Sequence, residues 1–123
     1  MRDHTKLRAF ELADQLALLT YRVTSMFPRE EQFGLASQMR RAAVSIASNI
    51  VEGSARVTQA EYLRFIEISY GSARELEYQA SLARRLSFLA VEDAEQLERL
   101  AIETCKVLNG LLRSLRKGQT PPA

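Results

Sequence analysis

Residues that terminate helices divide this sequence into four long segments, and that division constrains the fold more than any other feature. The sequence holds only five glycines and three prolines. Pro28 ends the first segment, Gly34 precedes the second, Gly53 closes it, and Pro121 and Pro122 follow the last segment. We therefore expect helices over residues of about 7–26, 35–53, 58–87 and 91–116.

The start of the third segment and the pattern of the fourth support this division. Thr58 and Glu61 have the spacing of a capping box, in which two side chains satisfy free amide groups at a helix start. At 100° per residue, the fourth segment gathers its apolar residues on one side, as an amphipathic helix does. These residues are Leu97, Leu100, Ala101, Val107, Leu108, Leu111 and Leu115.

Short connections make consecutive helices run antiparallel. The sequence therefore predicts an all-α fold, an antiparallel up-down-up-down four-helix bundle. At 123 residues the chain is long enough for one core. We expect a single domain over 1–117 and a disordered tail over 118–123.

Composition limits the classes of function. No apolar run approaches the ~20 residues that a membrane span requires, so we expect a cytoplasmic protein that does not enter a membrane. Cys105 and His4 are the only cysteine and the only histidine, which leaves too few ligands for a usual metal cluster and no histidine base beyond a terminal one. A phosphate-binding glycine loop is also missing. We predict that the protein is not an enzyme and binds no cofactor and no metal.

The first two segments carry more apolar surface than one bundle core needs. Beside the core stripe of residues 35–53 lies a second apolar strip that includes Val44, Ala47 and Val51. Residues 7–26 repeat this pattern. Surplus apolar surface usually marks contact with another chain, so we predict a homo-oligomer. The alternative is an offset packing that buries both strips within one chain. The predicted oligomer interface comprises Phe10, Ala13, Ala17, Tyr21, Val44, Ala47 and Val51.

Polar residues of the second and third segments line up along one edge of each predicted helix. An arginine at the margin of a core requires a partner or access to water, so Glu61 and Glu75 are the expected partners of Arg40 or Arg41. The predicted buried polar network comprises Arg40, Arg41, Asn49, Glu52, Glu61, Ser72 and Glu75.

Charge is distributed unevenly along the chain. The net charge is +2, but residues 106–123 contribute Lys106, Arg113, Arg116 and Lys117 with no acidic residue. One interpretation is contact with RNA or DNA, through Arg40, Arg41, Arg56, Arg113, Arg116 and Lys117. The alternatives are that Arg40 and Arg41 are structural, that Arg56 is solvated, and that the terminal cations offset the helix dipole.

A partner protein is the rival interpretation. An acidic run could suit a basic partner, although acidic residues also favour a helix start. This run comprises Glu92, Asp93, Glu95, Glu98 and Glu103. In this reading the oligomer is a scaffold without nucleic-acid contact.

Two strings carry a resemblance to a known family. These are "SQMRRAAVSIASNIVEG" (37–53) and "EYLRFIEISYGSARELEYQASLARRL" (61–86), preceded by Phe33-Gly34-Leu35 and followed by "LNGLLRSL" (108–115). The chain resembles the small bacterial four-helix-bundle proteins encoded in intervening sequences of large-subunit ribosomal RNA genes, often called 23S rRNA intervening-sequence proteins. It is also similar to the accessory variability determinant of diversity-generating retroelements, a pentameric ring that binds nucleic acid.

The resemblance implies a four-helix bundle, a homopentamer and a role with RNA or DNA. The characteristic residues of the family fall on Gln38, Arg40, Arg41, Ser45, Asn49, Glu52, Gly53, Arg56, Glu61, Phe65, Gly71, Ser72 and Glu75. The sequence departs from the family pattern at Ala47, where proline is frequent, at Val51, where alanine is frequent, and at Ala90, where serine often caps the last helix.

Overall fold

Each of the four long segments forms one α-helix in the computed structural model, which describes residues 2–118. The helices are α1 (Arg8–Thr24), α2 (Leu35–Ser54), α3 (Gln59–Arg85) and α4 (Val91–Lys117). The predicted boundaries are confirmed to within two residues. Two short 3-10 helices, η1 (His4–Lys6) and η2 (Arg29–Glu31), precede α1 and α2 and were not predicted.

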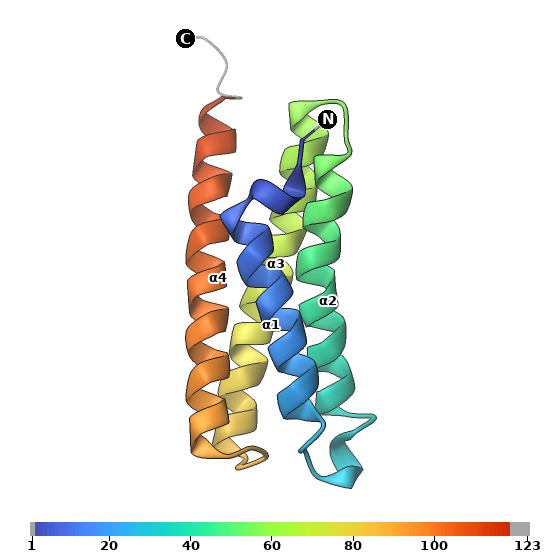
Figure 1. The fold of residues 1–123 in the computed structure, drawn as a ribbon, viewed down its shortest axis with the longest axis vertical. Helices are drawn as coiled ribbons and strands as arrows, with labels where there is room; N and C mark the ends of the chain where they lie inside the picture. Colours follow the sequence, from blue (N-terminus) through green and yellow to red (C-terminus); the bar gives the residue numbers. More distant parts are fainter. Residues whose placement is uncertain (1, 119–123) are drawn as a thin grey trace.

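Consecutive helices run antiparallel, which confirms the predicted four-helix bundle (Figure 1). Each helix packs against two neighbours, in the pairs α1·α2, α2·α3, α3·α4 and α1·α4. The N-terminus, the α2–α3 turn and the C-terminal end of α4 therefore lie at one end of the bundle (Figure 1). The α1–α2 connection and the α3–α4 turn lie at the other end. Of the expected tail, only Gly118 belongs to the described residues; 119–123 lie outside them.

The core runs along the bundle axis and takes aliphatic residues from all four helices. Burial of such side chains contributes ~1.5–3 kcal/mol each to folding. The largest fully buried aliphatic side chains are Leu12, Leu16, Met39, Ile46, Ile50, Ile66, Leu76, Leu97, Leu108 and Leu112.

The helices α2 and α3 approach each other closely near their connection. A Cβ atom built on Gly53 would lie 2.7 Å from Cβ of Phe65 and 3.3 Å from Cδ1 of Tyr62. Deeper in the same seam, the buried Ser69 hydroxyl donates to the Ile46 carbonyl at 2.8 Å. A glycine and a small hydroxyl residue thus let the two backbones pack tightly.

The helix termini differ in how well they are capped. The Glu61 amide donates to the Thr58 hydroxyl oxygen at 3.1 Å, so Thr58 caps α3 as predicted. The other half of the predicted capping box differs, because the Glu61 carboxylate accepts from the Thr58 hydroxyl at 2.9 Å instead of from the Thr58 amide. Ala90, by contrast, takes the N-cap position of α4 without a side-chain hydrogen bond. α3 ends in a turn at Ser87, the only non-glycine residue of 2–118 with a positive φ (61°).

None of the helices within residues 2–118 is long and apolar enough to cross a lipid bilayer.

Candidate nucleic-acid interface

Four of the six predicted nucleic-acid residues lie at the same end of the bundle. Arg56 sits in the α2–α3 turn, and Arg113, Arg116 and Lys117 lie in the last turns of α4, so the antiparallel topology brings them to the end that also holds the N-terminus (Figure 1). We call this end, with Arg2, the basic end. Its cations come from segments that are far apart in the sequence.

Arg2 and Arg56 are held in place by neighbouring groups. The Arg2 guanidinium donates to the Arg56 carbonyl at 2.9 Å and to the Gln59 side-chain oxygen at 3.1 Å. It also lies 4.1 Å from the ring centroid of Tyr62, and the Arg56 guanidinium lies 4.7 Å from that of Phe65. Arg2 and Arg56 line a surface hollow of about 580 Å³ with Ala55 and Val57. The guanidinium groups are thus ordered without being neutralised, since their partners carry no charge.

The cations of α4 differ in their availability. Arg116 forms an ion pair with Glu67 of α3 at 3.0 Å. The side chains of Lys106, Arg113 and Lys117 are exposed and form no hydrogen bond or ion pair within residues 2–118. A cation without an intramolecular partner needs to give up only water to bind a phosphate. Lys106 was not among the predicted residues; its place in the basic C-terminal run was the signal that could have identified it.

Arg40 and Arg41 lie away from the basic end. Arg40 is half-buried, and its Nε donates to the Thr24 hydroxyl oxygen at 2.8 Å. Its guanidinium lies 5.0 Å from the ring centroid of Tyr21. Arg40 therefore fastens α2 to α1 as a structural residue. Arg41 is exposed and lines a different surface, between α2 and α3.

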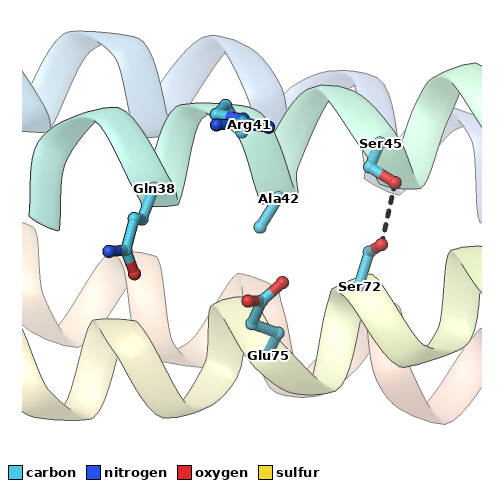
Figure 2. Close-up of a pocket in the computed structure, with 6 residues that line it drawn as sticks. All are labelled: Gln38, Arg41, Ala42, Ser45, Ser72 and Glu75. Atoms are coloured by element: carbon cyan, nitrogen blue, oxygen red, sulfur yellow. Dashed lines mark hydrogen bonds between the residues drawn. The ribbon is translucent and has the colours of Figure 1, made fainter.

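That surface is a groove of about 440 Å³ in the side of the bundle. Gln38, Arg41, Ala42 and Ser45 of α2 line it together with Ser72 and Glu75 of α3. Figure 2 shows Gln38 and Glu75 projecting into the space between the helices, while the hydroxyls of Ser45 and Ser72 close one end with a 2.8 Å hydrogen bond. Neither Arg41 nor Glu75 has an ion-pair partner in the described part of the chain.

The expected buried polar network is wrong for most of its charged members. Four of them, Arg41, Glu52, Glu61 and Glu75, are exposed. The Glu61 carboxylate serves the α3 cap instead of pairing with an arginine. These side chains start at the margin of the core, where they can reach water and so avoid the cost of burying a charge.

Its neutral members do form hydrogen bonds. The Asn49 amide donates to the Ser45 carbonyl at 2.8 Å and to the Ser45 hydroxyl oxygen at 3.0 Å, and Ser45 is bonded to Ser72. The neutral part of the predicted network thus links α2 to α3, and Arg40 links α2 to α1.

Most predicted interface residues form a strip along the junction of α1 and α2. Tyr21, Val44 and Val51 are 48%, 43% and 39% exposed, and the remaining members, Phe10, Ala17 and Ala47, are half-buried. Arg40 of α2 reaches both Tyr21 and Thr24 of α1, so the apolar faces of the two helices meet at this junction. We call these six residues the α1–α2 apolar strip.

Ala13 does not belong to this strip. It is fully buried within the chain (0% exposed) and packs in the core cluster with Ala9 and Leu16. Its assignment to the oligomer interface is therefore wrong, because the position faces the bundle axis and has no surface to offer a second copy.

The acidic run at the start of α4 is partly neutralised by the chain itself. Asp93 pairs with Arg22 at 3.6 Å, Glu98 with Arg84 at 3.0 Å, and Glu103 with Arg8 at 3.0 Å. These exposed pairs contribute ~0–1 kcal/mol each, and they leave less free acidic surface for a basic partner than the sequence suggests.

Residues 2–118 contain no group of three or more His, Cys, Asp and Glu side chains that could hold a metal ion. Cys105 is buried in α4, and burial raises the pKa of its thiol to about 12, with a smaller contribution from Glu77. A thiol with such a pKa stays protonated near neutral pH and is a poor nucleophile.

Comparison with known proteins agrees with this architecture. A crystal structure of a protein with unknown function from the S23 ribosomal protein family of Bacteroides thetaiotaomicron VPI-5482 has the same fold, with a TM-score of 0.78, and is 22% identical. The match covers 85% of this chain and 95% of that one. Comparison with curated proteins gives no significant match. The model of the family described as 23S rRNA-intervening sequence protein matches residues 5–110, and the chain therefore belongs to this family.

Proposed function

We propose that the protein is a non-enzymatic homo-oligomer, a pentamer by its family resemblance, that binds RNA or DNA through the phosphate backbone. The observation that carries this proposal is the convergence of cations from three separate segments, Arg2, Arg56 and the end of α4, at one end of the bundle (Figure 1). In a homo-oligomer, every copy of the chain would contribute one such basic end.

Assembly is what makes the basic end effective. A single chain carries a net charge of only +2 and is a weak ligand for a polyanion. The α1–α2 apolar strip runs along the side of the bundle and offers a surface for a second copy. A closed ring of bundles packed side by side would place all basic ends at one rim, where each cation is repeated in every copy.

Contact with the backbone should dominate over contact with bases. Base stacking requires exposed aromatic rings near the cations. Tyr62 and Phe65 at the basic end are covered by the guanidinium groups of Arg2 and Arg56, and Tyr62 is buried. The fully exposed Phe33 lies in the α1–α2 connection, at the other end of the bundle. Binding should therefore be insensitive to sequence and should weaken steeply with salt.

Fluorescence anisotropy with labelled RNA and duplex DNA, at low and at moderate salt, tests the proposal. We expect binding to both at low salt, with Arg113→Gln weaker than wild type. Arg29→Gln is the matched control, because it removes the same charge from an exposed residue of η2 at the opposite end of the bundle. Absence of binding at low salt would contradict the proposal, and so would an equal loss in both variants.

A scaffold for a partner protein is the second candidate, and the α2–α3 groove is the observation that favours it. The groove offers an arginine and a glutamate together with serine hydroxyls, a mixture that suits a polypeptide better than a phosphate backbone (Figure 2). A pull-down with and without nuclease, using wild type and a Glu75→Arg variant, separates the candidates. A partner that survives nuclease and is lost in Glu75→Arg would favour the scaffold.

A further inference from the structure

Gly110 lies inside α4, two turns before the end of the helix. A glycine inside a helix is destabilising relative to alanine. Such a residue is commonly explained by close packing, but a Cβ atom built on Gly110 would meet no other atom within 4 Å. The residue is exposed, and none of the glycines within residues 2–118 has a positive φ. The open space beside this backbone is therefore available to a molecule from outside.

The cations around Gly110 indicate what that molecule is. Lys106 precedes Gly110 by one turn, and Arg113 and Lys117 follow it by one and two turns, so all four residues share the outward side of α4. Lys106 and Arg113 stand ~10 Å apart along the helix axis, with the bare backbone of Gly110 between them. All three cations are exposed and lack intramolecular partners in the described chain. The sequence from Thr104 to Gly118 contains no acidic residue.

Gly71 provides a contrast within the same molecule. It lies in the middle of α3, is exposed and also has nothing within 4 Å of a built Cβ atom. Its neighbours one turn away include Glu67 and Glu75, and the nearby Arg74 is paired with Glu77 at 3.8 Å. The gap at Gly71 is thus flanked by Glu75, by Glu67 in its pair with Arg116 and by the paired Arg74, whereas the gap at Gly110 is flanked by cations without such a partner.

We infer that nucleic acid lies along the outward side of the last turns of α4, where its phosphate backbone approaches the helix at Gly110 between Lys106, Arg113 and Lys117. This inference rests on the proposed function and specifies its contact surface. It places the ligand beside the helix rather than only across the basic end at Arg2 and Arg56. A side chain at position 110 would hold the phosphates away from these three cations.

Anisotropy with labelled duplex DNA and RNA, measured over a series of salt concentrations, tests the inference. Gly110→Leu should weaken binding about tenfold, the scale of losing one charge-assisted contact, although leucine is uncharged and favours a helix. Gly71→Leu, the matched control, should bind like wild type. Lys106→Gln should weaken binding and lower the slope of log K against log salt by about 1, whereas Arg29→Gln should leave both unchanged. Thermal melting should show both leucine variants folded and no less stable than wild type.

The outcomes separate this inference from the proposed function. If wild type binds but Gly110→Leu and Lys106→Gln bind equally well, the inference is overturned and the proposed function stands. If Gly71→Leu weakens binding as much as Gly110→Leu, or if Gly110→Leu changes the mass of the assembly, the gap serves another purpose and the inference is again overturned. Failure of wild type to bind either nucleic acid at low salt overturns both.

Discussion

Replacing Gly53 by alanine should destabilise the bundle, although alanine is the better helix former. The added Cβ atom would lie 2.7 Å from Cβ of Phe65 and 3.5 Å from the Tyr62 carbonyl oxygen. The first contact is shorter than real Cβ contacts, and the Cβ atom of Phe65 cannot swing aside as the end of a flexible side chain can, whereas the second is an ordinary van der Waals distance. α2 and α3 would have to separate near their connection, which loosens the core behind them.

The expected change in the free energy of unfolding of Gly53→Ala is the sum of two opposing contributions. Overpacking in a tight seam costs ~1–3 kcal/mol, while the intrinsic preference of alanine over glycine in a helix returns up to ~1 kcal/mol. The expected net loss is about 1–2 kcal/mol. For a domain of this size, 1 kcal/mol corresponds to a change in Tm of roughly 4 °C, so Gly53→Ala should melt about 4–8 °C below wild type.

Gly110→Ala is the internal reference for this prediction. The same atoms are added at a helical glycine, but into open space, so only the favourable term remains and Tm should rise by roughly 2–4 °C. Thermal unfolding followed by circular dichroism, at one fixed protein concentration because assembly contributes to stability, gives both values. If Gly53→Ala melts at or above wild type, or if both variants shift in the same direction, the close approach of α2 and α3 is not what the structure implies.

Three further changes probe single features. Ala90→Ser should raise stability by about 0.5–2 kcal/mol in thermal unfolding, because α4 lacks a side-chain cap. No gain would show that the free amide groups at the start of α4 do not need a side-chain acceptor. Thr24→Val should lower stability by about 1–3 kcal/mol, since it leaves the half-buried Nε of Arg40 without its acceptor; an unchanged melting curve would mean that Arg40 finds another partner. The folded-state pKa of the Cys105 thiol, about 12, lies above its usual value of 9.0, so this thiol contributes stability below pH 9.0 that is lost as pH rises towards 12. Urea unfolding across this range should therefore show a steeper decline for wild type than for Cys105→Ala, and parallel declines would refute the role of the thiol.

The backbone of this protein could be predicted from the sequence because local signals determine it. Pro28 and Gly34 bracket the first connection, Thr58 marks the start of α3, and the connections on either side of α3 are too short for anything but antiparallel neighbours. These signals act over a few residues and do not depend on distant packing. The 3-10 helices were missed because a single turn leaves no periodic pattern.

Side-chain partners across helices could not be predicted in the same way. Angular position placed Arg40 at the margin of the core, but the rotation and register of the neighbouring helix decided that it meets Thr24 rather than a carboxylate. Ala13 was assigned to the wrong surface for the same reason, since a shift of a few tens of degrees separates the core from the interface. A pattern along one helix specifies a face and leaves open what that face touches.

The candidate interface was predictable in part. The basic C-terminal run is visible in the sequence, and the antiparallel topology is enough to bring Arg56 to the same end. Pairing is not visible there: Arg116 is matched with Glu67, which precedes it by 49 positions, while Lys106 stays free. Similarly, the sequence does not show that Gly53 is covered by α3 while Gly110 is open.

The proposed binding of nucleic acid depends on association of several copies of this chain through the α1–α2 apolar strip. Analytical ultracentrifugation of the purified protein at micromolar concentration, with wild type beside a Val44→Lys variant, measures this directly. We expect a wild-type mass that is a multiple of the 13.9 kDa chain and a smaller mass for the folded variant. A wild type that sediments as a 13.9 kDa monomer would contradict it.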